Sequence, residues 1–386
     1  MKAIIMTMAC SIWMMAAMAQ ESTNEREKSG ACSNYSERGG KQSQRATVYF
    51  TKDISAESLV NIYKALGVET TGQVALKIST GESERSNHLR PAFIKPLVDE
   101  TKATIVECNT AYGGNRSTTE AHLRAISERG FDKIAKVDIM DAEDTIHIPV
   151  QDTKHIAYNI VGSHLANYDF MINLAHFKGH AMGGFGGVLK NASIGVAAKS
   201  GKSYIHSGGR SITNPWGGEQ DPFLESMAAA AQSVHNYFGG KVLYINVMNN
   251  LSIDCDCDGN PHKPEMSDIG ILASTDPVAL DKACLDLVFN HDNTTGDTAV
   301  PLQNRINSLH GTWTVEYAEQ IGLGTQAYTL IDLDDQTGID KTISDKGTPI
   351  YNVYSVDGKR VLSRTKNIES LAEGTYIING KKTTIK

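Results

Sequence analysis

The chain has 386 residues, of which 21% are charged and 40% are hydrophobic. This balance is typical of a globular protein with a buried core, and it excludes a collagen-like, disordered or multi-span membrane chain. The formal net charge of −7 excludes nucleic acid as an expected partner, because nonspecific binding to nucleic acid needs a basic surface. Six cysteines are too few for a disulfide scaffold of this size.

Residues 1–19 have the pattern of a signal peptide. Lys2 precedes an apolar run at 3–18, and Ala17-Met18-Ala19 offers a small-residue cleavage site. The alternative is a buried N-terminal helix, which no amphipathic pattern supports. We therefore expect an exported protein that is periplasmic, on the cell surface or secreted. No stable membrane span is expected after cleavage, because the run is shorter than the roughly 20 residues that a span needs.

The next segment, 20–45, is polar and rich in Gly and Ser, which predicts a disordered linker. From residue 46 to 335 the pattern alternates between strands and helices. Strands are expected at 47–51, 73–78, 103–108, 168–174, 241–248 and 269–274. Helices are expected after Ser55, from Pro91, over 117–129, over 224–238 and after Asp276. This alternation predicts an α/β fold whose mostly parallel sheet is flanked by helices.

Residues 340–386 form a separate small β module in this interpretation. Two alternating runs surround the turn-forming pairs Asp357-Gly358 and Asn379-Gly380. The module resembles the C-terminal tails of many exported Bacteroidetes proteins, which in some species act as sorting signals. An accessory β domain without a sorting role is an equal alternative.

Polar, glycine-containing segments follow four of the expected strands. They lie at 79–82, 109–116, 176–187 and 249–259. Ligands bind at the carboxyl ends of strands in open parallel sheets, so the four segments are expected to meet at one cleft.

The segment 176–195 is the most distinctive of the four. Its glycines predict a loop, and a helical pattern begins at Gly187. A glycine loop that runs into a helix N-terminus presents free N–H groups to an anion, so an anionic small molecule is the expected ligand. The alternative is a tight turn with helix packing. The residues expected to contact the ligand here are Gly183, Gly184, Gly186, Gly187 and Asn191.

The catalytic candidates come from the same segment. Lys178 and Lys190 would add positive charge for the ligand, and His176 and His180 are candidates for an acid/base or a metal ligand. The HExxH zinc motif is excluded because residue 177 is Phe and the glycines oppose a helix. His206 is a further candidate for ligand binding.

Residues 254–259 read Asp-Cys-Asp-Cys-Asp-Gly. Thiolates and carboxylates this close repel one another, and a divalent cation would relieve the repulsion. Cys255 and Cys257, with a carboxylate from Asp254 or Asp256, are therefore candidate ligands for a metal, with zinc favoured. A disulfide or a solvated acidic turn would explain the same residues.

The segment 109–122 contributes two more candidates. Asn109 and Arg116 are expected to contact the ligand, since an arginine can clamp a carboxylate or phosphate through two hydrogen bonds. Alternatively, Arg116 and His122 are solvated residues at a helix end.

Several long segments make the chain resemble the domain of unknown function 362 family, whose members are often called uncharacterised iron–sulfur centre proteins. The matching segments are 90–100, 109–123, 176–195, 198–207, 241–259, 269–288 and 313–324. The resemblance implies no settled reaction. Many members carry a ferredoxin-like insert after the position of His206-Ser207, where this chain has only residues 208–221. We therefore expect no ferredoxin-type iron–sulfur cluster. The export signal also departs from the usual cytoplasmic member.

The leading hypothesis is an exported protein with an anion- and metal-binding cleft, active as a metal-assisted enzyme. Two alternatives use the same residues: a binding protein without turnover, and a redox protein in which Cys255 and Cys257 cycle between dithiol and disulfide. The sequence indicates no oligomeric state.

Overall fold

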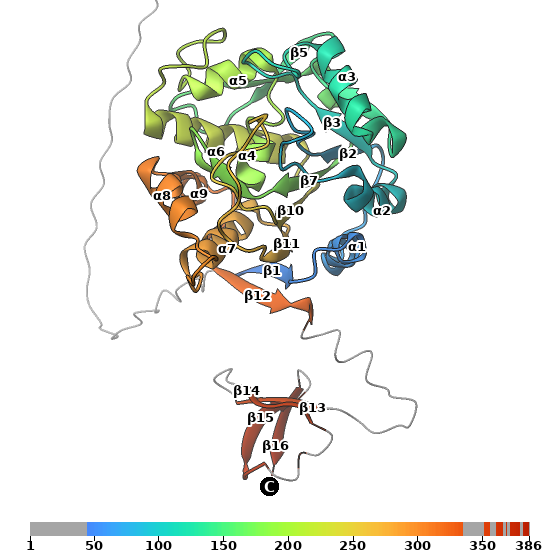
Figure 1. The fold of residues 1–386 in the computed structure, drawn as a ribbon, viewed down its shortest axis with the longest axis vertical. Helices are drawn as coiled ribbons and strands as arrows, with labels where there is room; N and C mark the ends of the chain where they lie inside the picture. The colour runs from blue at the N-terminus through green and yellow to red at the C-terminus, as the bar shows by residue number, and fades with distance from the viewer. Residues whose placement is uncertain are drawn as a thin grey trace, which may run out of the picture. The chain divides into compact units, whose positions relative to one another are not determined.

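A computed structural model describes residues 45–334, 351–355, 360–365, 368, 371–378 and 381–385 (Figure 1). The predicted signal peptide at 1–19 lies outside the described residues, as does the predicted linker except Arg45. The turn pairs Asp357-Gly358 and Asn379-Gly380 also lie outside them. Export and the linker therefore stay predictions.

One eight-stranded sheet organises residues 45–334, within the described part of the chain. Its strands are β1 (Ala46–Thr51), β2 (Val74–Lys77), β3 (Thr104–Glu107), β4 (Val137–Ile139), β7 (Phe170–His176), β10 (Val242–Met248), β11 (Gly270–Ser274) and β12 (Tyr328–Asp332). Their spatial order is β12-β1-β11-β10-β7-β2-β3-β4. Only β11 runs antiparallel to its two neighbours, so the predicted mostly parallel sheet is confirmed.

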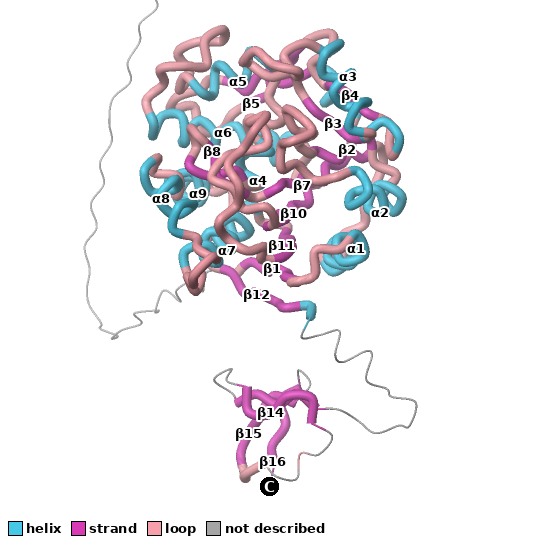
Figure 2. The backbone as a smooth tube through the Cα atoms, viewed as in Figure 1, coloured by secondary structure: helices cyan, strands magenta, loops and turns pink. Residues whose placement is uncertain are grey.

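Helices cover both faces of this sheet (Figures 1 and 2). They are α1 (Ala56–Ala65), α2 (Pro91–Thr101), α3 (Thr119–Arg129), α4 (Val188–Ala192), α5 (Lys199–His206), α6 (Gln220–Tyr237), α7 (Pro277–Phe289), α8 (Val300–Ser308) and α9 (Trp313–Gln320). Helices α1 to α3 share an apolar core with Leu76 and Ile105, whereas α4, α6 and α7 share another with Ala75 and Val106. Alternate strand residues therefore face opposite helical layers, as the strand period of two requires.

Local chemistry sets the ends of the predicted helices. The Ser55 side chain caps α1 by accepting from the Ser58 N–H, and the Asp276 carboxylate caps α7. Pro91 stands at the first turn of α2, where its missing N–H costs no helical bond. Gly130 ends α3 in the left-handed conformation with φ 80°.

The structure also differs from the sequence prediction. The expected loop within 176–187 contains a short hairpin, β8 (Lys178–His180) paired with β9 (Gly184–Gly186). The helix expected to run on from Gly187 stops at Ala192, and α5 starts separately at Lys199. Elements that were not predicted include α8, α9, β4, β12 and the hairpin of β5 (Thr145–Pro149) and β6 (Tyr158–Gly162).

A small antiparallel sheet lies in the C-terminal part, as predicted. Its strands are β13 (Tyr351–Ser355), β14 (Arg360–Thr365), β15 (Gly374–Ile378) and β16 (Lys381–Ile385), in the order β14-β13-β15-β16. Separately, the described part of the chain contains no helix with the length and apolar character that a membrane crossing requires.

The connections define a switch point in the large sheet. From β2 the chain adds β3 and then β4 on one side, and it later returns to place β7 on the other side of β2. Loops leaving β2 and β7 therefore diverge, which opens a crevice at the carboxyl ends of these strands.

Candidate functional site

A cavity of about 320 Å³ lies at this switch point. The loops after β2, β3, β7 and β10 all contribute to its lining, for example through Ser79, Thr110, His180 and Cys255. The expectation that the four polar segments meet at one cleft is thus confirmed. A cavity of this size suits a small molecule.

A fully paired charge network forms one part of the site. Lys77, at the end of β2, contacts Glu107, at the end of β3, with Nζ 2.9 Å from Oε2. Arg116 contacts Glu82 at 3.1 Å and Glu107 at 3.5 Å. Burial opposes ionisation of Glu107, but the charges of Lys77 and Arg116 outweigh it and lower the pKa of Glu107 to about 2. Arg116 is therefore a buried ion-pair partner rather than a solvated helix-end residue, and His122 is buried as well.

A second paired group surrounds Asp256. Its two carboxylate oxygens accept from His176 Nδ1 at 2.8 Å and from Lys178 Nζ at 2.9 Å. The other ring nitrogen of His176 contacts the carbonyl oxygen of Asn249 at 2.6 Å. Burial opposes ionisation of Asp256, yet the charges of Lys178 and His176 hold its pKa well below the usual range. Because both partners of His176 are acceptors, neither ring nitrogen is free to take a proton from a substrate.

Lys190 differs from the other lysines that line the cavity. It extends from α4, and its Nζ has no hydrogen-bond or ion-pair partner among the residues that the structure describes. Burial and the nearby charge of Lys178 lower the pKa of Lys190 to about 7. Gly186 lies between the two side chains, since a Cβ there would be 3.4 Å from Lys190 Cδ and 3.7 Å from Lys178 Cε.

Two histidines line the same cavity, the buried His180 and the half-buried His206. His180 Nδ1 accepts the backbone N–H groups of Met182 and Gly183, the latter at 2.8 Å, so the proton of the neutral ring is on Nε2. Burial and the charge of Lys190 hold the pKa of His180 well below its ordinary value. The same two causes lower the pKa of His206 to about 3, and its Nδ1 is buried without a partner in the described structure. Both rings are neutral at physiological pH.

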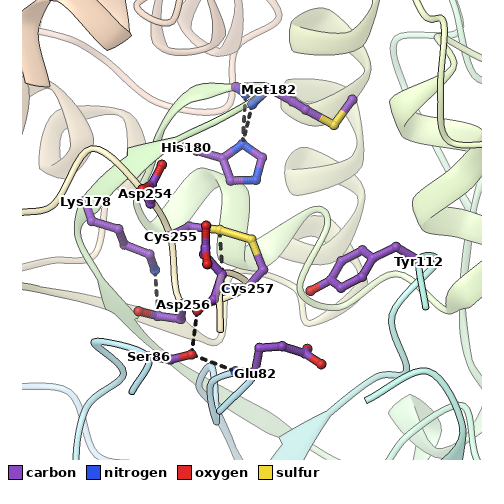
Figure 3. The surroundings of a disulfide bond; sticks show 12 residues. Glu82, Ser86, Tyr112, Lys178, His180, Met182, Asp254, Cys255, Asp256 and Cys257 are labelled. Carbon is purple, nitrogen blue, oxygen red and sulfur yellow. Dashed lines mark hydrogen bonds and ion pairs between the residues drawn. A yellow bond between two sulfur atoms is a disulfide. The ribbon is translucent and has the colours of Figure 1, made fainter. Parts of the chain in front are cut away.

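Cys255 and Cys257 form a disulfide that lines the cavity. Figure 3 shows the His180 imidazole facing this bond, with Lys178 and Asp256 beside it. One nitrogen of His180 and the two sulfur atoms lie within 4.8 Å of one another. Two thiolates and an imidazole are a ligand set that zinc accepts, so the reduced pair with His180 is a possible metal site. The disulfide predicted as an alternative to metal binding is present in the structure.

The expected anion site at the helix N-terminus is already filled. The Val188 and Leu189 N–H groups at the start of α4 donate to the buried Asp281 carboxylate at 2.9 and 3.0 Å. A Cβ at Gly187 would lie 2.2 Å from Asp281 Oδ1, which explains the glycine. The prediction of free N–H groups at this terminus was therefore wrong, because a side chain 93 residues away supplies the anion.

Other candidate residues hold the site together. Asn191 accepts from Lys77 Nζ and donates to Asn173. Asn109 donates to Thr119, outside the residues that line the cavity. Gly184 packs against Gly311 with φ 78°, and the Gly183 N–H bonds to His180.

Asp254, a predicted carboxylate ligand of the metal, does not join the His180–cysteine group. Its partners are His262 and Arg305.

The sequence analysis missed three charged residues of the cavity: Lys77, Glu107 and Lys202. Lys77 and Glu107 each end a buried strand, and a charge at that position is the signal that would have found them. Lys202 gave no such signal, because a lysine within a short polar helix is ordinarily solvated. The segment 208–221 also reaches the cavity, through Pro215 and Trp216.

The fold and the cavity define an α/β protein with a cationic pocket at the switch point of its sheet. Residues 74–286 match the model of the family described as domain of unknown function (DUF362). This match spans more than half of the chain, so the chain belongs to that family.

Other comparisons add little. A comparison with curated proteins finds no match. Among solved structures, the lactate racemase apoprotein from Thermoanaerobacterium thermosaccharolyticum is similar at 16% identity and a TM-score of 0.34. The alignment covers 53% of this chain and 51% of that one, and so weak a likeness carries no argument about activity.

Proposed function

We propose that the protein binds an anionic small molecule in the cavity at the switch point. The observation that carries this proposal is the charge of the lining. Its cationic side chains are Lys77, Arg116, Lys178, Lys190 and Lys202, whereas its carboxylates are Glu107 and Asp256. In a chain with a net charge of −7, this local excess of positive charge favours an anion from solution.

The unpartnered Lys190 is the expected contact for the anionic group. Lys77 and Lys178 are held by carboxylates, and the Lys202 amine donates to the Ala197 carbonyl. Only Lys190 therefore gains a partner without breaking an existing bond, among the cavity lysines that the structure describes. The Nε2–H of His180 and the ring of His206 supply neutral polar contacts for the rest of the ligand.

A metal ion is the second part of the proposal. In the reduced state, Cys255, Cys257 and His180 offer three ligands, which would leave a fourth position of zinc open to the anionic molecule. Bound there, zinc would act as a Lewis acid on the ligand, which is the basis of the metal-assisted enzyme hypothesis. Ligation through Nε2 would displace the proton that this nitrogen carries, so binding is expected to weaken as the pH falls.

Isothermal titration calorimetry with sulfate and with glycolate tests the anion site. The chain is studied as the mature protein, 20–386, beside a Lys190→Met variant and a Lys133→Met control that removes an exposed lysine elsewhere. We expect the Lys190 variant to lose about tenfold to a hundredfold in affinity, because a hydrogen bond to a charged group contributes about 1.5–3 kcal/mol. Equal affinity in the two variants would contradict the proposal.

The disulfide itself favours a thiol redox function as a second candidate. Cys255 and Cys257 are paired and border the cavity, whereas Cys108 and Cys284 are buried free thiols. An exported location, if the signal peptide is used, would keep the pair oxidised. Thiol titration under native conditions, before and after mild reduction, should show two new thiols. No new thiols in the wild type, or the same two in a Cys255→Ser/Cys257→Ser variant, would remove this candidate.

A further inference from the structure

We propose that Lys190 is a nucleophilic amine that forms an imine with the carbonyl carbon of an anionic oxo acid bound in the cavity. The inference rests on the proposed function, because the anionic group is what brings the carbonyl into the cavity. It goes further by naming the substrate class and a covalent step.

The contacts of the lysines separate Lys190 from its neighbours. An ammonium held by a carboxylate is stabilised in its charged form, and this is the setting of Lys77 and Lys178. Lys190 lines the same cavity without a carboxylate partner among the described residues. A lysine that attacks a carbonyl must be neutral, so the unpaired side chain is the one suited to this role.

The charges around Lys190 favour its neutral form. Lys178, Arg116 and Lys77 act against a further positive charge, while Asp256 acts for it. Asp256 is itself neutralised by the contact with Lys178. With burial added, the pKa of Lys190 falls to about 7, so a large fraction of the amine is unprotonated at neutral pH.

The cavity supplies the other parts of the reaction. Lys190 is the expected contact for a simple anion such as sulfate, but with an oxo acid it meets the carbonyl carbon instead. The positive charge of the other cationic side chains of the lining attracts the carboxylate into the cavity. The amine nitrogen bonds to the carbonyl carbon, and one proton passes from nitrogen to oxygen to give a carbinolamine. The second amine proton then passes to the hydroxyl group, which leaves as water as the C=N bond forms. His206 is suited to carry that proton, because its ring is neutral and its Nδ1 is buried without a described partner. No oxidant or reductant is needed for this step.

Reductive trapping with glyoxylate tests the inference. The mature protein is incubated at pH 7 with glyoxylate and sodium cyanoborohydride, whose hydride reduces the imine to a stable secondary amine. Peptide mapping by mass spectrometry then locates the adduct. We expect Lys190 to be modified at least about tenfold faster than any other lysine, because ordinary lysines are almost wholly protonated at pH 7. Sulfate should slow the reaction at Lys190 alone.

The wild-type adduct map is decisive even if a variant fails to fold. A Lys190→Arg variant should show no fast adduct, and a Lys133→Arg control should keep it. Uniform modification of all lysines would overturn the imine inference. If glycolate, which has no carbonyl, still binds in that case, the proposed anion site stands without the covalent step. If neither glycolate nor sulfate binds, the proposed function fails as well.

Discussion

Two groups of nitrogen-bearing side chains share the cavity and differ in how they are partnered. The paired group consists of Lys77, Arg116 and Lys178, each held by a buried carboxylate. The open pair consists of Lys190 and His206, with a Lys190 amine and a His206 Nδ1 that lack partners among the described residues.

This difference separates the side chains that hold the site together from the side chains that are available to a ligand. A buried polar atom without a partner, such as His206 Nδ1, costs about 1–3 kcal/mol and persists only where other interactions compensate. The paired group fixes the ends of β2 and β3 and the disulfide loop in place. The open pair faces the space that those residues create, and it keeps its hydrogen-bonding capacity for a ligand.

The paired group should show the largest effect on stability. In a Glu107→Gln variant, Lys77 and Arg116 lose a shared counter-charge, and we expect unfolding to become easier by about 3–5 kcal/mol. Urea denaturation measures this loss, and Glu120→Gln on exposed helix surface is the control. A loss no larger than in the control would contradict a structural role.

The same carboxylate predicts a pH dependence. Its pKa is lowered from 4.5 to about 2 on folding. The stabilisation is therefore fully present above pH 4.5 and is lost as the pH falls towards 2. The stability difference between the wild type and Glu107→Gln should shrink over that window, as urea denaturation at several pH values would show. A difference that stays constant would mean that Glu107 is not held ionised by the network.

The metal content of variants tests whether Cys255 and Cys257 bind a metal ion. Reduced protein reconstituted with zinc should bind one ion, and the Cys255→Ser/Cys257→Ser variant should bind none. Asp254→Asn should keep its zinc, because Asp254 contacts His262 and Arg305 instead of joining the His180 group. Elemental analysis decides the matter. Zinc retained by the double variant, or absent from the reduced wild type, would remove the metal site.

The open pair should have the opposite effect on stability from the paired group. Folding lowers the pKa of Lys190 from 10.5 to about 7, so the unfolded chain binds more protons between these values. The cost of burying Lys190 is full below pH 7 and fades as the pH rises towards 10.5. Lys190→Met should therefore be more stable than the wild type at pH 6, by about 1–3 kcal/mol, and the gain should shrink at pH 9. A variant less stable than the wild type at pH 6 would show that Lys190 has a structural partner.

The sequence predicted the helices, strands and loops that border this site better than it predicted the contacts within the site. Ser55, Pro91 and Asp276 mark the starts of helices through local chemistry, so they were found without the fold. The four polar segments were found because each follows an apolar strand, and parallel strands end at the same edge of a sheet.

The contacts that could not be predicted join residues that are far apart in the sequence. The ion pair of Lys77 and Glu107 depends on β2 and β3 being neighbours, and Asp281 fills the α4 terminus from a distant helix. No local pattern reveals either contact. The glycine run was interpreted as a loop, yet its glycines permit a tight hairpin against other backbone, as at Gly179 beside Ile253.

Proton uptake on sulfate binding tests the central claim most directly. Sulfate stays fully ionised near neutral pH, so any proton taken up must go to the protein. A bound anion favours the charged form of Lys190, which is largely neutral at pH 8 in the free protein. Calorimetry in buffers of different ionisation enthalpy should show proton uptake for the wild type and for Lys133→Met, and none for Lys190→Met. Binding without proton uptake, or equal uptake in all three proteins, would contradict an anion site at Lys190.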